Sequence, residues 1–579
     1  MRASAGSAGF DHEVDLLVLG AGAAGMTAAL VAAIEGFQPL LCEKTGRVGG
    51  TSARSSGGIW VPGNRQTAQR GRPDSLAAAR AYLGARLGPD EHPLREKYLS
   101  TAPAVVDYLE ANSDVRFAPI GMHPDYWPYD GAARGGRPLQ AEAFDGRQLG
   151  KDFELVAPPL PALMALGGMM VGRADIPALL RPLGSAASLR RAAGLLGRYA
   201  RDRPSHSRGT RLLMGNALVA RLFYSLKKRG VPIWLGAPAV ELLRENGTVA
   251  GAVIDRGGEV RRVRARFGVV LATGGFSHGP GWRGRLMLAR EAGALSLASE
   301  GCTGDGLTLA EAGGAVVARG GIEHAAVWAP VSVMKQPDGR ELRYPHFFMD
   351  RPKPGIVAVN RRGRRFTNEA ASYHDFVAGM LTSAETASEL PAYLVCDHRF
   401  LRRYGLGLVL PGHRRLRPFV KAGYLALGRS LAELAGSLGI DAAGLAETVD
   451  RNNRFADAGT DEDFGKGSSF FNRFHGDPAV GPNPCLGRIE QPPFAAIRIW
   501  PADLSTHAGV AADAHCQALD ARGIPIPGLH VCGNDLATIW GGEAPGPGVT
   551  LGPAVIFGYH AAMHAVGGGP AAANTRTNP

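Results

Sequence analysis

The chain has 579 residues, of which 45% are hydrophobic and 20% are charged. This composition is that of an ordinary globular protein and excludes a fibrous or largely disordered chain. A chain of this length is too long for one hydrophobic core, so we expect two or more structural units. The net charge of +12 is concentrated, because nine arginines and only two aspartates lie between Val171 and Arg211. The position of this charge therefore matters more than its total.

The first fourteen residues contain no apolar stretch of the kind that a secretory signal needs, and we interpret them as a short mobile tail. The resulting expectation is a cytoplasmic location. Six cysteines are scattered without a Cys-x-x-Cys pair, so we predict neither a disulfide framework nor a metal site. No apolar run has the length of a membrane-spanning helix, since the nearest, residues 157–172, is interrupted by prolines and glycines.

A strand, a turn and a helix are predicted at the start of the chain. Residues 15–19, DLLVL, form a short apolar run typical of a buried parallel strand, and GAGAAG follows at once before the helical pattern MTAALVAAIEG. In such a unit Gly20 permits a tight turn, Gly22 lets the backbone approach a pyrophosphate, and Gly25 lets the helix pack on the strand. The next strand, PLLCEK, contains Glu43, whose carboxylate is spaced to bind ribose hydroxyls. We therefore predict a dinucleotide site at the helix N-terminus.

Three further segments favour FAD over NAD. Residues 47–60, RVGGTSARSSGGIW, are rich in small side chains that let backbone donors approach a bulky flat cofactor. Residues 267–276 and 526–535 are strand patterns that end in glycine, and the second leads through a glycine-rich loop into a helix whose N–H groups could face a flavin. No second GxGxxG follows a strand, so no NAD(P)H site is predicted. The predicted cofactor-binding residues are Gly20, Gly22, Ala23, Ala24, Gly25, Glu43, Lys44, Gly50, Thr51, Ser52, Ser56, Gly57, Gly58, Ala272, Thr273, Gly274, Gly533, Asn534, Gly548, Val549, Thr550 and Leu551.

With these segments in this order, the chain resembles the flavoprotein family that unites soluble fumarate reductases with 3-ketosteroid dehydrogenases. The resemblance extends over nearly the whole chain and is closer to the 3-ketosteroid Δ1-dehydrogenase branch, through SARSSGGIWVPGN, RRFTNEAASYHDF and APGPGVTLGPA. It implies an α/β fold in which a Rossmann-like FAD-binding domain is assembled from both chain ends and carries an inserted α+β substrate domain. We expect the FAD-binding domain in residues 1–325 and 500–579 and the substrate domain in residues 326–499.

The resemblance also implies a reaction. Tyr373 matches the base that removes a proton beside a ketone while the neighbouring carbon transfers hydride to flavin N5. Tyr126 matches the tyrosine that supports this base, although Trp127 and Tyr129 compete for the position. The N–H of Gly548 matches a donor that polarises the ketone. The expected reaction is the desaturation of a small hydrophobic ring ketone, steroid-like, with Tyr373, Tyr126 and Gly548 as catalytic residues.

One position departs from the branch. Ala544 stands where the branch has a tyrosine whose hydroxyl also polarises the ketone, and loss of one such donor typically costs about 100-fold or more in rate. Glu543 is adjacent, but it would have to be protonated to take over that role. Two alternatives stay open: an ene reductase or fumarate-reductase-like enzyme that transfers hydride from reduced flavin to an activated alkene, and a flavin-binding protein without activity. The loop 541–552 contains no arginine, which argues against a dicarboxylate substrate, and we interpret His507 as structural.

Residues 157–210 form an inserted segment that begins apolar and continues basic. Leu189, Leu195, Leu196 and Tyr199 are spaced for one face of a helix, with arginines on the other face. Such a helix suits the surface of an anionic membrane. It would also suit a position on the FAD-binding domain or at a subunit contact. Nucleic acid is not an expected partner because no aromatic residues alternate with the arginines, and the sequence indicates neither the electron acceptor nor the oligomeric state.

Overall fold

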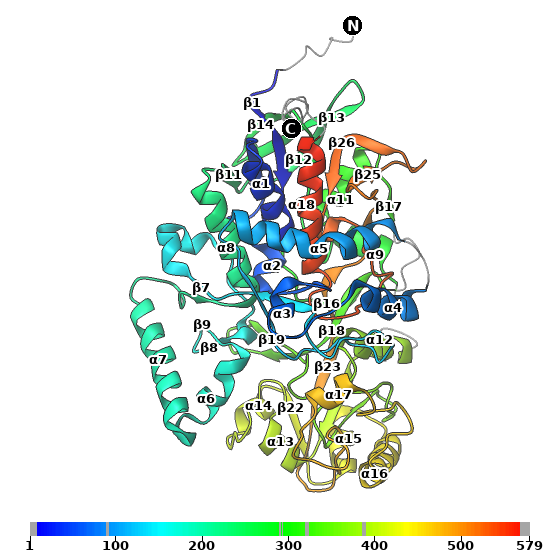
Figure 1. The fold of residues 1–579 in the computed structure, drawn as a ribbon. Coiled ribbons are helices and arrows are strands. Elements are labelled where there is room, and N and C mark those ends of the chain that lie inside the picture. Colours follow the sequence, from blue (N-terminus) through cyan, green and yellow to red (C-terminus); the bar gives the residue numbers. More distant parts are fainter. Residues whose placement is uncertain are drawn as a thin grey trace.

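A computed structural model describes residues 9–88, 92–288, 291, 293–318, 324–384 and 389–567. In Figure 1 the strands and helices from the two ends of the chain, drawn in blue and red, lie together in the upper half of the molecule. Elements drawn in yellow-green to yellow form most of the lower half, whereas green and orange elements occur in both halves. The chain therefore leaves the upper half, builds the lower half and returns.

The upper half contains a six-stranded sheet made from distant parts of the sequence. Its strands, in spatial order, are β11 (Ile233–Leu235), β3 (Pro39–Glu43), β2 (Leu16–Leu19), β15 (Val269–Leu271), β26 (Pro525–Val531) and β25 (Gln517–Leu519). All neighbours pair in parallel except β25, which is antiparallel to β26. In β15, Val269 lies opposite Leu17 on one side and Leu529 on the other. The predicted strands at the start, middle and end of the chain are thus neighbours.

Helix α1 (Ala23–Ile34) is buried along nearly its whole length. A helix that is apolar all round is expected between two layers, and α1 packs against the sheet and against α18 (Leu551–Gly567). A Cβ atom added at Gly558 would lie 2.5 Å from the carbonyl oxygen of Ala24, so the two helix backbones touch. Helix α1 begins three residues before the predicted apolar pattern because the glycine turn itself forms its first turn.

The lower half is organised around the 13-residue strand β23 (Phe494–Thr506). The sheet consists of β19 (Glu341–Pro345), β18 (Ala326–Lys335), β23, β21 (Ala392–Cys396) and β20 (Ile356–Val359), with β16 (Leu295–Ser296) and β22 (Leu425–Gly428) also paired to β23. Helices α15 (Leu431–Leu438) and α16 (Ala442–Ala458) lie over β20 and β22 and close a second small core. Strand β23 crosses the predicted boundary at residue 499, so the return to the upper half takes place within one long strand.

The N-terminal tail is shorter than predicted. Residues 1–8 lie outside the described residues, but strand β1 (His12–Val14) pairs in parallel with β14 (Glu259–Ala265). The prediction of a tail through residue 14 was therefore wrong for its last three residues. A three-residue strand held by backbone bonds to a distant edge has too short a side-chain pattern to be read from sequence.

The inserted segment 157–210 forms its own small layer at the left of Figure 1, where α6 (Ile176–Leu180) lies beside α7 (Ala186–Asp202). Helix α7 buries only Ala192 and Asp202. Leu189 and Leu196, on its predicted apolar face, are 49% and 42% exposed. The helix therefore does not use this face to pack on the FAD-binding sheet. Within the described ranges, no helix has both the length and the apolar character needed to cross a bilayer.

Candidate active site

One cavity of about 380 Å³ runs from the carboxyl ends of β2, β3 and β15 to the lower sheet. Its wall contains every predicted cofactor-binding residue except Gly25 and Val549, together with Tyr126 and Tyr373. Gly25 lies behind the wall, and a Cβ atom there would be 1.9 Å from the carbonyl oxygen of Gly20, so it serves the predicted close packing of helix on turn. Val549 is also buried behind the wall, where its carbonyl accepts a hydrogen bond from Trp540 Nε1 at 2.6 Å.

The dinucleotide end of the cavity is built around a fixed carboxylate. Glu43, the last residue of β3, accepts hydrogen bonds from the N–H of Ala21 at 2.9 Å and from the N–H and hydroxyl of Thr45, both at 2.9 Å. Gly20 has φ +107°, and a Cβ atom there would lie 2.2 Å from the carbonyl oxygen of Ala272. Only glycine therefore fits at this turn. The arrangement presents Glu43 and the start of α1 to the same end of the cavity.

Asp535 is a site residue that the sequence did not reveal. It is fully buried and follows Gly533 and Asn534 of the cavity wall. Its carboxylate accepts hydrogen bonds from the N–H groups of Thr273 at 2.5 Å and Gly275 at 2.8 Å, and from the Thr273 hydroxyl at 3.1 Å. Asp535 thereby ties the loop after β15 to the loop after β26. The available signal was an acidic residue four positions after the end of an apolar strand.

The middle of the wall is formed by closely packed small residues. Ser52, in α2 (Gly50–Arg54), accepts a hydrogen bond from the N–H of Ala23 at 3.1 Å, which joins α2 to the start of α1. A Cβ atom at Gly548 would lie 2.4 Å from the carbonyl group of Gly58, so the C-terminal loop touches strand β4 (Gly58–Trp60). The cavity thus has the first residues of α1 and of α18 in one wall. Two helix N-termini in a wall of backbone fit a pyrophosphate and the pyrimidine edge of a flavin, whose carbonyl oxygens accept hydrogen bonds, so the residues present suit FAD.

The two predicted tyrosines meet in the cavity. The Tyr126 hydroxyl donates a hydrogen bond to the Tyr373 hydroxyl at 3.2 Å, and the ring centroids are 5.7 Å apart. Neither Trp127 nor Tyr129 is in the cavity wall, so Tyr126 is the one of these three candidates that lies beside Tyr373 in the cavity. Burial raises the pKa of both phenols, while the hydrogen bond from Tyr126 lowers that of Tyr373. Tyr373 is also the first residue of α12 (Tyr373–Ser383), where the helix N-terminus favours a phenolate.

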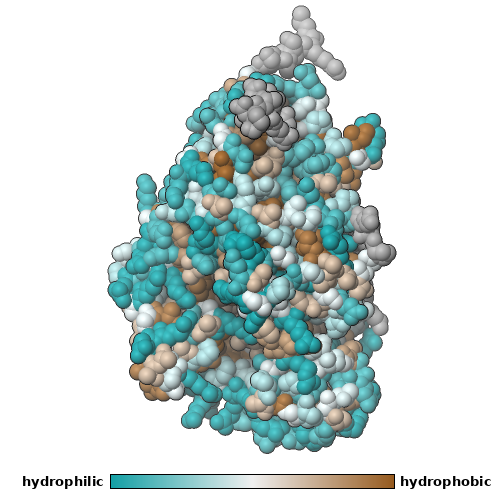
Figure 2. Space-filling model, in the orientation of Figure 1, coloured by the Kyte–Doolittle hydropathy of each residue, from teal (hydrophilic) through white to brown (hydrophobic). Residues whose placement is uncertain are grey.

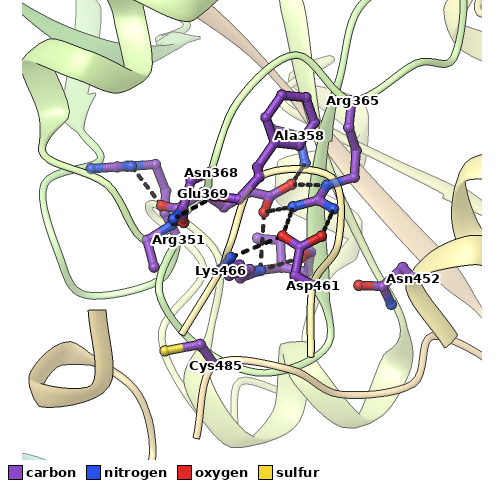
Figure 3. A network of polar contacts seen from close by, with 12 residues as sticks. Arg351, Ala358, Arg365, Asn368, Glu369, Asn452, Asp461, Lys466 and Cys485 are labelled. Carbon is purple, nitrogen blue, oxygen red and sulfur yellow. Dashed lines mark hydrogen bonds and ion pairs between the residues drawn. The ribbon is translucent and has the colours of Figure 1, made fainter. Parts of the chain in front are cut away.

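A buried ionic cluster holds the loop that carries Tyr373 (Figure 3). Arg365 lies 2.8 Å from Glu369 and 2.9 Å from Asp461, and Lys466 Nζ lies 3.3 Å from Glu369. All four side chains are 5% exposed or less. The motif RRFTNEAASY therefore contains, besides Tyr373, a structural ion pair that fixes the turn before α12. The sequence motif gave no hint that Asp461 and Lys466 complete the cluster.

The end of the cavity near the tyrosines is largely apolar. Its wall contains Ile120, His123, Leu160, Leu163, Arg173, Phe347 and Phe348, none of which the sequence singled out. Leu160, Leu163 and Arg173 come from the inserted segment, which therefore also lines the cavity. The one sequence signal is the apolar start of the segment 157–210, for which the pattern predicts a membrane surface, a position on the FAD-binding domain or a subunit contact, but not a cavity wall.

Three residues considered for the ketone or substrate site lie outside the cavity wall. Ala544 is fully buried. Glu543 accepts hydrogen bonds from Arg86 at 3.0 and 3.1 Å and faces a separate, smaller cavity. His507 is 1% exposed, its Nδ1 lies 3.3 Å from the carbonyl oxygen of His324, and burial lowers its pKa to about 4. By contrast, Gly548 is in the wall, and its N–H has no acceptor among the described residues.

Comparison with protein families matches residues 15–551 to the family described as FAD binding domain. The chain belongs to this FAD-binding family. The match confirms the prediction of FAD as the cofactor. The matched residues include the first and last parts of the chain that contribute strands to the six-stranded sheet, as well as the segment between them. FAD supplies a two-electron acceptor at the cavity when it is bound.

Similar proteins confirm the resemblance to the ketosteroid dehydrogenase branch. The chain is 37% identical to 4-oxocyclohex-2-ene-1-carboxylate 5-dehydrogenase of Sinomonas cyclohexanicum, over 94% of this chain and 92% of the relative. It is 35% identical to 3-oxosteroid 1-dehydrogenase of Mycobacterium tuberculosis, over 96% of this chain and 98% of the relative. The crystal structure of 3-ketosteroid Δ1-dehydrogenase from Sterolibacterium denitrificans in complex with 1,4-androstadiene-3,17-dione superposes with a TM-score of 0.87 at 33% identity, over 96% of this chain and all of that chain. The mixed α/β fold of an FAD-binding flavoenzyme is thereby confirmed.

Proposed function

We propose that this flavoprotein desaturates a ring ketone. The observation that carries the proposal is the hydrogen-bonded pair Tyr126 and Tyr373, which lies in the wall of the same cavity as Gly548 and the FAD-binding glycines. A base, a donor for the ketone oxygen and a hydride acceptor are the three groups that this reaction needs. The residues proposed for the first two tasks line the same cavity as the FAD-binding glycines, and this supports the proposal.

Each residue has one task in the proposed reaction. The Tyr373 phenolate takes a proton from the carbon beside the carbonyl, and the Tyr126 hydroxyl stabilises that phenolate before the transfer. The N–H of Gly548 donates to the ketone oxygen, where negative charge develops. Bound FAD would supply the acceptor for the hydride that leaves the neighbouring carbon. One proton and one hydride leave, and a carbon–carbon double bond conjugated with the ketone forms.

The apolar wall supports a carbocyclic substrate. Phe347, Phe348, Leu160 and Leu163 present hydrocarbon surface beside the tyrosines, and this surface favours a ring over an open-chain polar acid. The two relatives described above are named for an oxidised ring ketone, in a steroid in one case and in a cyclohexene in the other. A ring ketone is the feature that the two names share. Incubation with either type of ketone and an artificial electron acceptor is expected to give a product two hydrogens lighter by mass spectrometry, and an unchanged ketone would refute the proposal.

In the proposed function, cofactor binding and catalysis are assigned to two domains, each built around one of the two sheets. An FAD-binding domain assembled from residues 1–325 and 500–579 supplies the glycine wall, and a substrate domain in residues 326–499 supplies Tyr373. The parallel pairing of strands from both chain ends supports the proposed FAD-binding domain. The ionic cluster around Glu369 supports the proposed substrate domain. Tyr126 comes from the FAD-binding part, so each part provides one tyrosine of the pair.

Replacement of Tyr126 by phenylalanine is expected to shift the pH dependence of kcat to higher pH. The base must be ionised, so activity is lost as pH falls through the pKa of Tyr373. The hydrogen bond from Tyr126 lowers that pKa, and its removal therefore raises it. Rate measurements across alkaline pH check this, with Tyr129→Phe, outside the cavity wall, as the matched control. A pH profile of kcat that is the same in Tyr126→Phe and in the parent protein would contradict the role of Tyr126.

We also propose that the inserted segment rests on an anionic membrane surface. Leu180, Leu183 and Leu189 are 46%, 86% and 49% exposed. Figure 2 shows hydrophobic surface at the lower left, where Figure 1 places α6 and α7. Arg181 and Arg190 are exposed beside these leucines in the sequence. Exposed leucines flanked by arginines match the chemistry of a lipid interface, where each arginine contributes about 1 kcal/mol.

Co-sedimentation with vesicles in which about one third of the phospholipid is anionic tests this contact. The double variant Leu183→Ser and Arg190→Gln is expected to bind at least about tenfold more weakly than the parent protein. The control Ile524→Ser removes an apolar side chain that is 49% exposed and lies outside the segment. This variant is expected to bind the vesicles as the parent protein does. Equal binding of all three proteins, or no binding of the parent, would refute the proposal.

A further inference from the structure

We propose that Arg173 binds a carboxylate carried by the ring ketone, at the end of the substrate away from the ketone. This inference rests on the proposed function and adds the substrate class: a ring ketone that is also a monoanion. Arg173 begins a short helical turn (Arg173–Asp175) of the inserted segment and is an exposed residue in the cavity wall. Its guanidinium therefore faces both the cavity and solvent.

A layer of aromatic rings connects the tyrosine pair with Arg173. Tyr126 contacts Phe348, with ring centroids 6.0 Å apart, and Phe348 stacks on His475 at 4.4 Å. His475 in turn contacts Phe474 at 5.0 Å. The guanidinium carbon of Arg173 lies 5.5 Å from the ring centroid of Phe474. The arginine is thus separated from the tyrosine pair by a packed layer of rings, and Arg173, Tyr126 and Tyr373 all line the same cavity, in which a carbocycle could lie along this layer.

Within the described residues, the positive charge of Arg173 is not neutralised by an acidic side chain. Among the described residues no carboxylate pairs with it, although most arginines of the inserted segment have polar partners. The nearest acid in sequence, Asp175, is fully buried and accepts from Arg191 at 2.6 Å and from Arg211 at 2.9 Å. Asp175 therefore fixes the turn that carries Arg173 without neutralising it. An arginine held this way can form a bidentate bond with a carboxylate.

The other cations near Arg173 or in the described cavity wall are already committed. Lys353 Nζ donates to the carbonyl oxygens of His475 and Gly476, at 2.7 and 2.8 Å. Arg54 interacts with Glu300 and Cys302 at the dinucleotide end.

His123 and His475 lie between Arg173 and the tyrosines, and burial lowers their pKa values to about 4 and about 2, so both are neutral at physiological pH. The acidic side chains in the described cavity wall are Glu43 and Asp305. Glu43 is held beside the first turn of α1, and Asp305 is paired with Lys44 at 2.6 Å, so both belong to the dinucleotide end. The positive charge at the substrate end is that of Arg173.

The experiment compares an acid with its neutral ester. 4-Oxocyclohexanecarboxylate and its methyl ester are offered to the FAD-loaded parent protein, to Arg173→Gln and to the control Arg181→Gln, which changes an arginine of the same segment outside the cavity wall. Arg173→Gln is expected to lower kcat/KM for the acid by about 10- to 100-fold, through KM, because a charge-assisted hydrogen bond is lost. The same variant is expected to change kcat/KM for the ester by less than about threefold. Arg181→Gln is expected to match the parent protein on both compounds.

A loss of equal size on acid and ester, or no loss on either, would overturn the inference. Anaerobic calorimetric titration of the same compounds into the three holoproteins, with the flavin reduced beforehand so that it cannot accept hydride, provides a readout without turnover. Tighter binding of the acid than of the ester is expected only where Arg173 is present. If the parent protein turned over neither compound nor any ketosteroid, the proposed function would fall. Turnover of the ester without a preference for the acid would leave the proposed function standing and remove the role of Arg173 alone.

Discussion

Tyr373→Phe is expected to lower kcat for ring-ketone desaturation by about 10²- to 10⁴-fold, the range that a general base contributes. The phenyl ring keeps the packing against Phe347 and Phe348, whose ring centroids lie 5.1 and 5.6 Å from that of Tyr373. Only the hydroxyl that accepts the bond from Tyr126 is removed. Steady-state rates at saturating ketone, with an artificial electron acceptor, measure the loss.

The matched control is Tyr404→Phe, which removes a tyrosine hydroxyl bonded to Asp477 outside the cavity wall. This control is expected to keep the parent rate. The flavin absorbance spectrum should be the same in the parent protein and in both variants, since no FAD-binding residue is changed. A Tyr373→Phe protein that keeps its rate within about threefold would exclude Tyr373 as the base, because loss of a base has a larger effect.

Glu369→Ala is expected to lower the free energy of unfolding by about 3–5 kcal/mol, the usual cost of removing one partner of a buried ion pair. Arg365 and Lys466 would be left as buried cations with Asp461, and with Asp463 at 3.9 Å from Arg365, as the remaining carboxylates. The ion pairs with these cations lower the pKa of Glu369 below its ordinary value. The stability that Glu369 contributes is therefore present at neutral pH and is lost as pH falls through that lowered pKa.

Urea unfolding followed by circular dichroism measures the change. Glu447→Ala removes an exposed ion pair with Arg364 in the same region and is expected to leave the urea midpoint unchanged. The two variants should also differ in acid, because the parent and Glu447→Ala should lose stability at low pH while Glu369→Ala has already lost it. A Glu369→Ala protein as stable as Glu447→Ala would show that the cluster does not hold the Tyr373 loop.

Much of the FAD-binding part could be predicted from sequence because its constraints are local. Gly25 is required by a contact within one strand–turn–helix unit, Gly20 is required by the positive φ of that turn, and Glu43 follows at the end of the next strand. Those constraints place specific residue types at fixed spacings, which a sequence displays directly. Tyr373 and Tyr126 could be identified only through the family resemblance, since no spacing relates residues that lie 247 positions apart.

The remaining site residues could not be predicted because their roles arise from contacts between distant segments. Asp535 acts through Thr273 and Gly275, and Asp461 acts through Arg365. Arg173 belongs to a segment whose charge suggested only a surface function. Strand β1 has too few residues to show a pattern. In each case the sequence shows the residue type but does not show which distant residue it contacts in the fold.

The most direct measurement of the central claim is anaerobic stopped-flow absorbance of the FAD-loaded protein mixed with a ring ketone. The parent protein is expected to lose the oxidised flavin absorbance in a single turnover with a 3-ketosteroid or with 4-oxocyclohexanecarboxylate, and Tyr373→Phe is expected to do so at least about 100-fold more slowly. Flavin that stays oxidised in the parent protein with every such ketone, or bleaching at equal rates in the two proteins, would contradict the account.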